Sequence, residues 1–114
     1  MLRQIVETVR TCAFIESYEL LEYVEEESVQ FIRLKAVLRD GSSLHIREFL
    51  SPDKSKYSYH WQDADGKLIL RWDNAPHHRH ISTFPYHFHD GDSIEPSERI
   101  FIDEVLGETT KRLS

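Results

Sequence analysis

Residues 57–73 read YSYHWQDADGKLILRWD, and this stretch predicts a β-hairpin. Apolar and polar side chains alternate on both sides of Asp65-Gly66, a dipeptide typical of tight turns. Because successive strand residues point to opposite faces, a two-residue turn there gives one apolar face and one polar face, with His60 opposite Arg71. The cross-strand pairs expected from this register are Ser58–Asp73, Tyr59–Trp72, His60–Arg71 and Trp61–Leu70.

A second hairpin is expected just before the first. Residues 29–39 and 43–50 are rich in branched and apolar side chains and flank the turn dipeptide Asp40-Gly41. The expected apolar face holds Ile32, Leu34, Ala36, Leu38, Leu44, Ile46 and Leu50. Glu48 shares their parity, so it is expected on the apolar side, either as a buried ion-pair partner or as a general base.

The two ends of the chain favour helices. Apolar residues recur at helical spacing in residues 2–11 and again in residues 102–113. Residues 14–25 are ambiguous, and residues 75–98, which hold three of the four prolines, predict a loop with one edge strand near residues 84–88. The predicted fold is α+β: a single domain spanning residues 1–114, with a twisted antiparallel β-sheet of four to six strands in a meander of hairpins, a C-terminal helix and a short N-terminal helix.

Composition excludes several classes of protein. No stretch is apolar for long enough to cross a membrane, and charges at Arg3, Glu7 and Arg10 argue against a secretory signal, so we expect a cytoplasmic protein without a membrane partner. Cys12 is the single cysteine, which rules out an internal disulfide and a multi-cysteine metal site. The formal charge of −6 excludes a generally basic nucleic-acid-binding domain but allows a local basic patch.

A cationic row is expected on the polar face of the sheet. If both hairpins share one sheet, that face displays Arg33, Lys35, Arg39, His45, Arg47, His60 and Arg71. Asp73 is the one acidic residue expected among them. The row fits a platform for the phosphates of RNA or a nucleotide, and it also fits an ordinary solvated sheet face.

All seven histidines lie in the centre of the chain, between His45 and His89. Imidazoles there can transfer protons near neutral pH or bind a metal ion. His77 and His78 lie in the predicted loop and are candidate metal ligands, with His80, His87 and His89 as further imidazoles and Asp73 or Asp90 as a carboxylate. The leading expectation is no cofactor, with zinc or manganese as the alternative.

Three segments together carry a family resemblance. They are residues 57–62 (YSYHWQ), residues 71–78 (RWDNAPHH) and residues 83–89 (TFPYHFH). With the preceding strand that ends near Glu48, they resemble the TumE family of presumed toxins from toxin–antitoxin pairs over roughly residues 30–106. The resemblance implies growth inhibition and a small helix-turn-helix antitoxin as partner. Tyr86, Phe88 and Arg79 depart from the usual family pattern and leave the histidines of these segments intact.

The leading hypothesis is a toxin that cleaves RNA or inhibits translation, so RNA or the translation machinery is its expected target. Metal-free cleavage needs a proton acceptor, a proton donor and cations for the phosphorane charge. The expected catalytic residues are His60, Arg71, Asp73, His87 and His89, and the expected RNA-binding residues are Arg33, Lys35, His45 and Arg47. The alternatives are a metal-dependent phosphodiester hydrolase and a non-catalytic binding module, and a homodimer is kept as an option.

Overall fold

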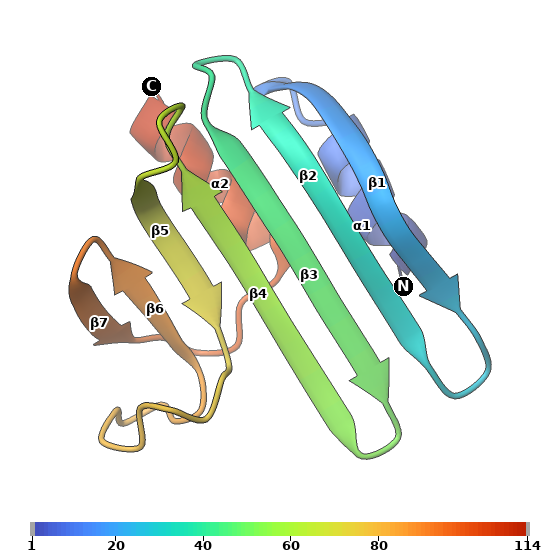
Figure 1. The fold of residues 1–114 in the computed structure, drawn as a ribbon, viewed down its shortest axis with the longest axis vertical. Helices are drawn as coiled ribbons and strands as arrows, with labels where there is room; N and C mark the ends of the chain where they lie inside the picture. The colour runs from blue at the N-terminus through green and yellow to red at the C-terminus, as the bar shows by residue number, and fades with distance from the viewer. Residues whose placement is uncertain (1, 114) are drawn as a thin grey trace.

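The computed structural model describes residues 2–113 as a seven-stranded antiparallel sheet with two helices, shown in Figure 1. The strands lie in the sheet in the order in which they occur in the chain, so the sheet is a simple meander. The elements are α1 (Leu2–Arg10), β1 (Ile15–Glu25), β2 (Gln30–Leu38), β3 (Ser43–Ser51), β4 (Lys54–Gln62), β5 (Leu68–Asp73), β6 (His87–Asp90), β7 (Ser93–Pro96) and α2 (Ile102–Leu113). The α+β class, the meander and both terminal helices are confirmed.

The sheet has one strand more than the upper end of the expected four to six. The ambiguous residues 14–25 contain the whole of β1. Its side chains are largely exposed on both faces, which explains the lack of a clear alternation. The edge strand expected near residues 84–88 begins only at His87, because Pro85 has no N–H to donate to a ladder. That strand is also not the edge, since β7 pairs with its outer side.

The turn of the β4–β5 hairpin is longer than expected. The backbone N–H of Asp63 donates to the Lys67 carbonyl (2.8 Å), so three residues rather than two lie between them. Gly66, the last of the three, adopts a φ of 85°, a conformation that only glycine takes at low cost. A register shift between Trp61 and Gln62 compensates for the extra residue, and all four expected cross-strand pairs are therefore confirmed.

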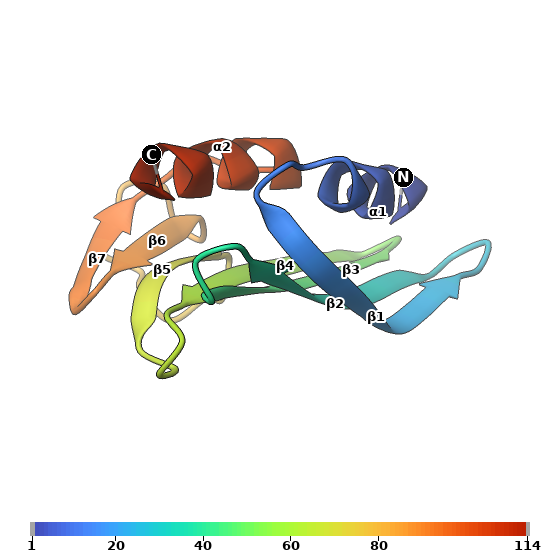
Figure 2. The same cartoon turned by 90° about the horizontal axis from the view of Figure 1, so that it is seen from above.

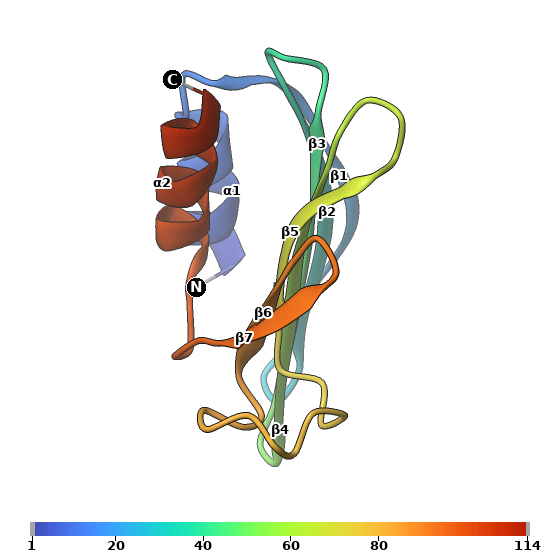
Figure 3. The ribbon, with the colours of Figure 1, turned by 90° about the vertical axis from the view of Figure 1, so that its left-hand side faces the viewer.

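Both helices pack on the same face of the sheet, as Figures 2 and 3 show from two directions. The apolar parities of β2–β5 face the helices and form the core with the apolar sides of α1 and α2. Within it, Trp61 is 2% exposed and its Nε1 donates to the Ser42 hydroxyl (2.9 Å). Leu50, expected in the core, is 37% exposed because it lies near the end of β3. Neither helix within residues 2–113 is long and apolar enough to span a membrane.

Two leucine-to-alanine variants test this one-sided core. Leu34 is 1% exposed on β2, whereas Leu21 on β1 is 42% exposed. We expect Leu34→Ala to lower the free energy of unfolding by about 2–5 kcal/mol, because it removes buried methyl groups and leaves a cavity. Leu21→Ala should change it by about 0.5 kcal/mol or less. Urea denaturation measures both, and equal losses would contradict the placement of the core.

Candidate functional site

The face of the sheet opposite the helices, here called the open face, carries the predicted row of cations and histidines except Arg39, which lies in the turn after β2. One line of cross-strand neighbours is Lys35, His45, His60, Arg71 and His89, and the next is Arg33, Arg47, Ser58, Asp73 and His87. Because these strands are direct neighbours, side chains from five strands of the meander lie side by side. The structure therefore brings His60, Arg71 and His89 together on three neighbouring strands, with His87 in the next line beside Asp73.

The open face has more acidic side chains than the sequence indicated. Strand β1, which the sequence left unassigned, brings Glu22 within 2.7 Å of Arg33 and places Glu19 opposite Lys35. The expectation that Asp73 is the one acid beside the cations is wrong for this reason. Arg33 and Lys35 lie at the acidic β1 side of the face, away from Asp73.

Asp73 is the centre of the polar contacts on β5. Its side chain is 6% exposed, and Oδ2 accepts a hydrogen bond from Nε of Arg71 (2.9 Å). Oδ1 accepts from the backbone N–H of Ala75 (2.9 Å) and lies 3.0 Å from Nε2 of His87. Nε2 of His89 lies 3.5 Å from Oδ2. One buried carboxylate thus joins the end of β5, the following loop and β6.

Arg71 also bridges to the next strand. Its Nη1 lies 3.1 Å from Nδ1 of His60, and because a guanidinium only donates, Nδ1 is the acceptor. A neutral His60 therefore carries its proton on Nε2. Burial lowers the pKa of His60, and the charges of Arg71 and His45 lower it further, so the neutral ring is favoured.

Two further histidines of the open face favour the neutral form. Burial lowers the pKa of His45, and the charge of Lys35 adds to this effect. Burial also lowers the pKa of His89; the Asp73 carboxylate opposes this shift, and the neighbouring His87 and His78 reinforce it. Near neutral pH these rings are therefore available as proton acceptors or as ligands.

Three histidines, here called the histidine cluster, come together beside Asp73. His87 and His89 project from β6 on the same side of the strand, and His78 reaches them from the loop between β5 and β6. One nitrogen from each ring lies within 4.8 Å of the others. His87 is 2% exposed, whereas His78 and His89 are half-buried. The loop histidine His77, also predicted as a ligand, is exposed and not part of this cluster.

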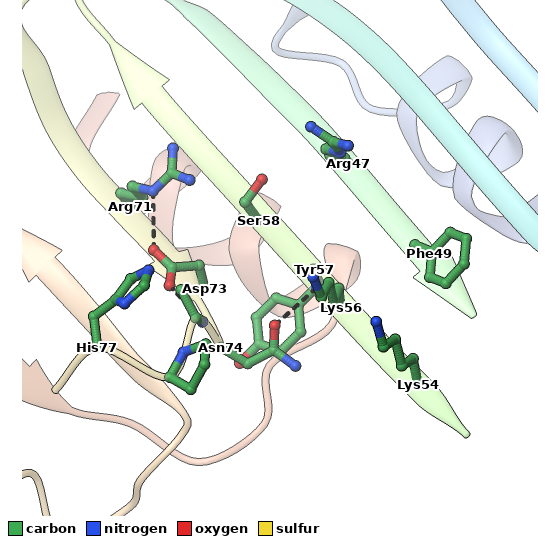
Figure 4. A pocket seen from close by; sticks show the side chains of 12 residues that line it. Arg47, Phe49, Lys54, Lys56, Tyr57, Ser58, Arg71, Asp73, Asn74 and His77 are labelled. Atoms are coloured by element: carbon green, nitrogen blue, oxygen red, sulfur yellow. Dashed lines mark hydrogen bonds and ion pairs between the residues drawn. The ribbon is translucent and has the colours of Figure 1, made fainter. Parts of the chain in front are cut away.

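A cavity of about 710 Å³ opens beside Asp73 and is drawn in Figure 4. Its lining includes four cationic side chains, Arg47, Lys54, Lys56 and Arg71, and the ring of Phe49. Sequence reasoning missed three of these residues, Phe49 and the two lysines. Phe49 has the same strand parity as Arg47, so the parity argument, carried further along β3, would have found it. His77 also lines this cavity, from its loop side.

The loop after β5 is tied to β4 by Asn74. The Asn74 Oδ1 accepts from the backbone N–H of Tyr57 (3.0 Å), and its Nδ2 donates to the Ser55 carbonyl (2.7 Å). The side-chain amide of Asn74 thus makes the hydrogen bonds to β4 that the backbone of one further β5 residue would make. These bonds fix the direction in which the chain leaves the sheet. This fixes one wall of the cavity.

Glu48 lies on the helix side of the sheet, as its parity indicated. Its Oε2 accepts a hydrogen bond from the Tyr59 hydroxyl (2.6 Å), and Oε1 lies 3.5 Å from Nη2 of Arg99. Burial raises the pKa of Tyr59, and the Glu48 carboxylate raises it further, so the phenol keeps its proton. This geometry favours the structural ion pair over a base that acts with the histidines, because the sheet separates the two groups.

The comparisons with known proteins give one match. The family model described as Toxin TumE matches residues 3–113, nearly the whole chain. No curated protein matches the sequence, and no solved structure matches the fold.

The lowered pKa of His60 predicts how stability depends on pH. Below its ordinary pKa of 6.5, His60 takes up a proton in the unfolded chain before it does so in the folded one. The folded state is therefore destabilised as the pH falls through this range. We expect His60→Gln to lose less stability than the wild type between about pH 7.5 and about pH 5.5, because glutamine does not titrate. Urea denaturation at both pH values checks this, and an identical loss in the two proteins would contradict it.

Proposed function

Because this chain belongs to the TumE toxin family, it is the toxin of a toxin–antitoxin pair, and we propose that it stops growth by cleaving RNA on its open face. The single observation that carries the proposal is the position of Arg71, between His60 on one neighbouring strand and His89 on the other. The proposal places the activity in the cytoplasm and makes a helix-turn-helix protein the antitoxin.

Binding of RNA rests on the charges around the cavity. Arg47, Lys54, Lys56 and Arg71 line it on a chain whose formal charge is −6, so the cations are concentrated locally. Guanidinium and ammonium groups bind phosphate oxygens, and they supply most of the affinity of proteins for nucleic acids. The Phe31 and Phe49 rings lie on the same face, 6.3 Å apart, and offer surfaces on which a base can stack.

Cleavage rests on the order of groups along one cross-strand line. His60, Arg71 and His89 lie on three neighbouring strands that are about 5 Å apart. With the scissile phosphate on Arg71, His89 takes the proton of the ribose 2′-hydroxyl, and the 2′-oxygen attacks phosphorus. The bond to the 5′-oxygen breaks while the imidazolium form of His60 gives that oxygen the proton on Nε2 and returns to the neutral ring. The lowered pKa of His60 makes this form scarce near neutral pH and a strong acid when it is present. The products are a 2′,3′-cyclic phosphate and a free 5′-hydroxyl.

The remaining predicted residues either position these three side chains or extend the surface that holds the RNA. Asp73 and His87 are buried, so they position the guanidinium of Arg71 and the ring of His89 and do not touch RNA. His45 lies beside His60, with ring centroids 6.1 Å apart, where it can contact the backbone of the bound strand. Arg33 and Lys35 extend the path of the RNA toward β1, where Glu19 and Glu22 limit it.

Metal-dependent hydrolysis of phosphodiesters is the second candidate. The observation that favours it is the proximity of the three rings of the histidine cluster, two of which also contact Asp73; these nitrogen and oxygen atoms are of the kinds typical of zinc ligands. The two candidates predict opposite effects of a metal chelator on RNA cleavage. Cleavage with His89 as proton acceptor continues when the chelator is added, whereas metal-dependent hydrolysis stops.

Two alanine variants test the binding surface. We expect Arg47→Ala and Lys56→Ala each to weaken the binding of single-stranded RNA, because each removes a phosphate contact. The slope of log affinity against log salt should decrease by about one in each variant. The matched control is Arg10→Ala, because Arg10 is exposed on α1 on the other side of the sheet. Fluorescence anisotropy measures both quantities, and losses equal to that of the control would contradict the assignment.

Two further variants test the chemistry. We expect His60→Ala and Arg71→Ala each to lower RNA cleavage by about 100-fold or more, because each removes a group that acts in the transition state. Growth arrest on induction should disappear with cleavage. His80→Ala, an exposed loop histidine, is the control and should keep both. With the fold confirmed by circular dichroism, unchanged cleavage in both variants rules out these roles.

A further inference from the structure

His87 and Asp73 are placed so that a positive charge is needed between them. Nδ1 of His87 lies 2.9 Å from the Pro85 carbonyl oxygen, which only accepts, so Nδ1 carries a proton. In the neutral ring, Nε2 then has a lone pair, and this lone pair lies 3.0 Å from Oδ1 of Asp73, which is also an acceptor. Two acceptors at this distance repel each other inside a protein unless a proton or a metal ion lies between them.

The other groups around this point favour a metal ion. A proton needs one donor and one acceptor, yet Nε2 of His89 lies 3.5 Å from the other oxygen of Asp73, and one ring nitrogen of His78 lies within 4.8 Å of those of His87 and His89. We propose that Asp73, His78, His87 and His89 bind one zinc ion. Three imidazoles and a carboxylate match the ligands that zinc prefers, and the set has too few oxygen atoms for magnesium or calcium.

The distances support four-coordinate binding. Zinc–nitrogen and zinc–oxygen bonds of about 2.0–2.2 Å place neighbouring ligand atoms of a tetrahedron about 3.3–3.5 Å apart. Oδ1 of Asp73 lies 3.0 Å from Nε2 of His87, and the other oxygen, Oδ2, lies 3.5 Å from Nε2 of His89, so each oxygen is close to this spacing from one ring and a small rotation of the carboxylate is needed for one oxygen to serve both. The three ring nitrogens lie within 4.8 Å of one another, so the half-buried His78 needs only a small movement of its loop to close the site.

Groups outside this set hold the ligands in place. The Pro85 carbonyl fixes the tautomer of His87 that leaves Nε2 free to bind metal. Arg71 and the backbone N–H of Ala75 donate to the Asp73 carboxylate and fix its orientation. The zinc ion would thereby join β5, β6 and the loop between them, which contains little regular structure of its own.

The zinc site deepens the proposed function, and its effect on RNA cleavage rests on that proposed function. Zinc and proton transfer use the same lone pair of His89, so under the leading mechanism bound zinc inhibits RNA cleavage. Zinc binding itself is measured without RNA, which keeps a failure of this inference separate from a failure of the proposed cleavage.

The experiment uses untagged full-length protein with zinc and, in parallel, with cobalt as a spectroscopic probe. We expect one zinc ion per chain by elemental analysis and calorimetry, and intense visible absorption by bound cobalt, which is typical of four-coordinate sites. His78→Ala and His89→Ala should each weaken zinc binding at least tenfold. His77→Ala and His80→Ala, from the same loop but outside the cluster, should bind like the wild type.

Circular dichroism of each variant separates loss of the site from loss of the fold. Absence of zinc binding by the folded wild type would overturn the inference, and so would equal binding by folded His78→Ala or His89→Ala. A wild type that binds zinc as proposed but never cleaves RNA, with or without the metal, would overturn the proposed function and leave the zinc site standing.

Discussion

The polar architecture of this protein depends on one buried carboxylate. Asp73 is 5% exposed, and a charge at such a position destabilises the fold by several kcal/mol unless hydrogen bonds and opposite charges compensate. The compensation comes from the guanidinium of Arg71 on β5 and from the backbone N–H of Ala75 in the loop that follows, both of which donate to the carboxylate. The arrangement of the loop, of β6 and of the open face follows from the need to satisfy this single group.

The two faces of the sheet differ in what they carry: the helix side holds the buried core, and the open face holds the polar groups that we propose for RNA cleavage. On the helix side, Tyr59 and Trp61 are buried and their polar atoms are satisfied by Glu48 and Ser42. On the other side, His60, which lies between them in the sequence, faces away from the core, and neither α1 nor α2 covers this face of the sheet (Figure 3). Because alternate residues of one strand point to opposite faces, substitutions of exposed residues on the open face can change the charge of that face with little effect on the core.

The sequence predicted the parts of the structure that follow from local alternation. The parity of residues 57–73 gave the correct cross-strand pairs even though the turn was one residue longer, because a bulge restored the register. It could not assign β1, whose exposed residues lack alternation, and so it missed the acidic partner of Arg33. His78 was a candidate ligand, but its meeting with β6 depends on the path of an irregular loop, which no periodicity describes.

The order of the strands has a consequence for synthesis on the ribosome. Each strand pairs with the strand that precedes it in the chain. The sheet can therefore form strand by strand during translation, because each new pairing closes only a short stretch of chain. The acidic strand β1 is made before the other strands, whereas His87 and His89 on β6 follow β1–β5, and α2 follows them. A nascent chain interrupted before β6 therefore has most of the sheet but lacks His87 and His89, and it cannot carry out the cleavage that we propose.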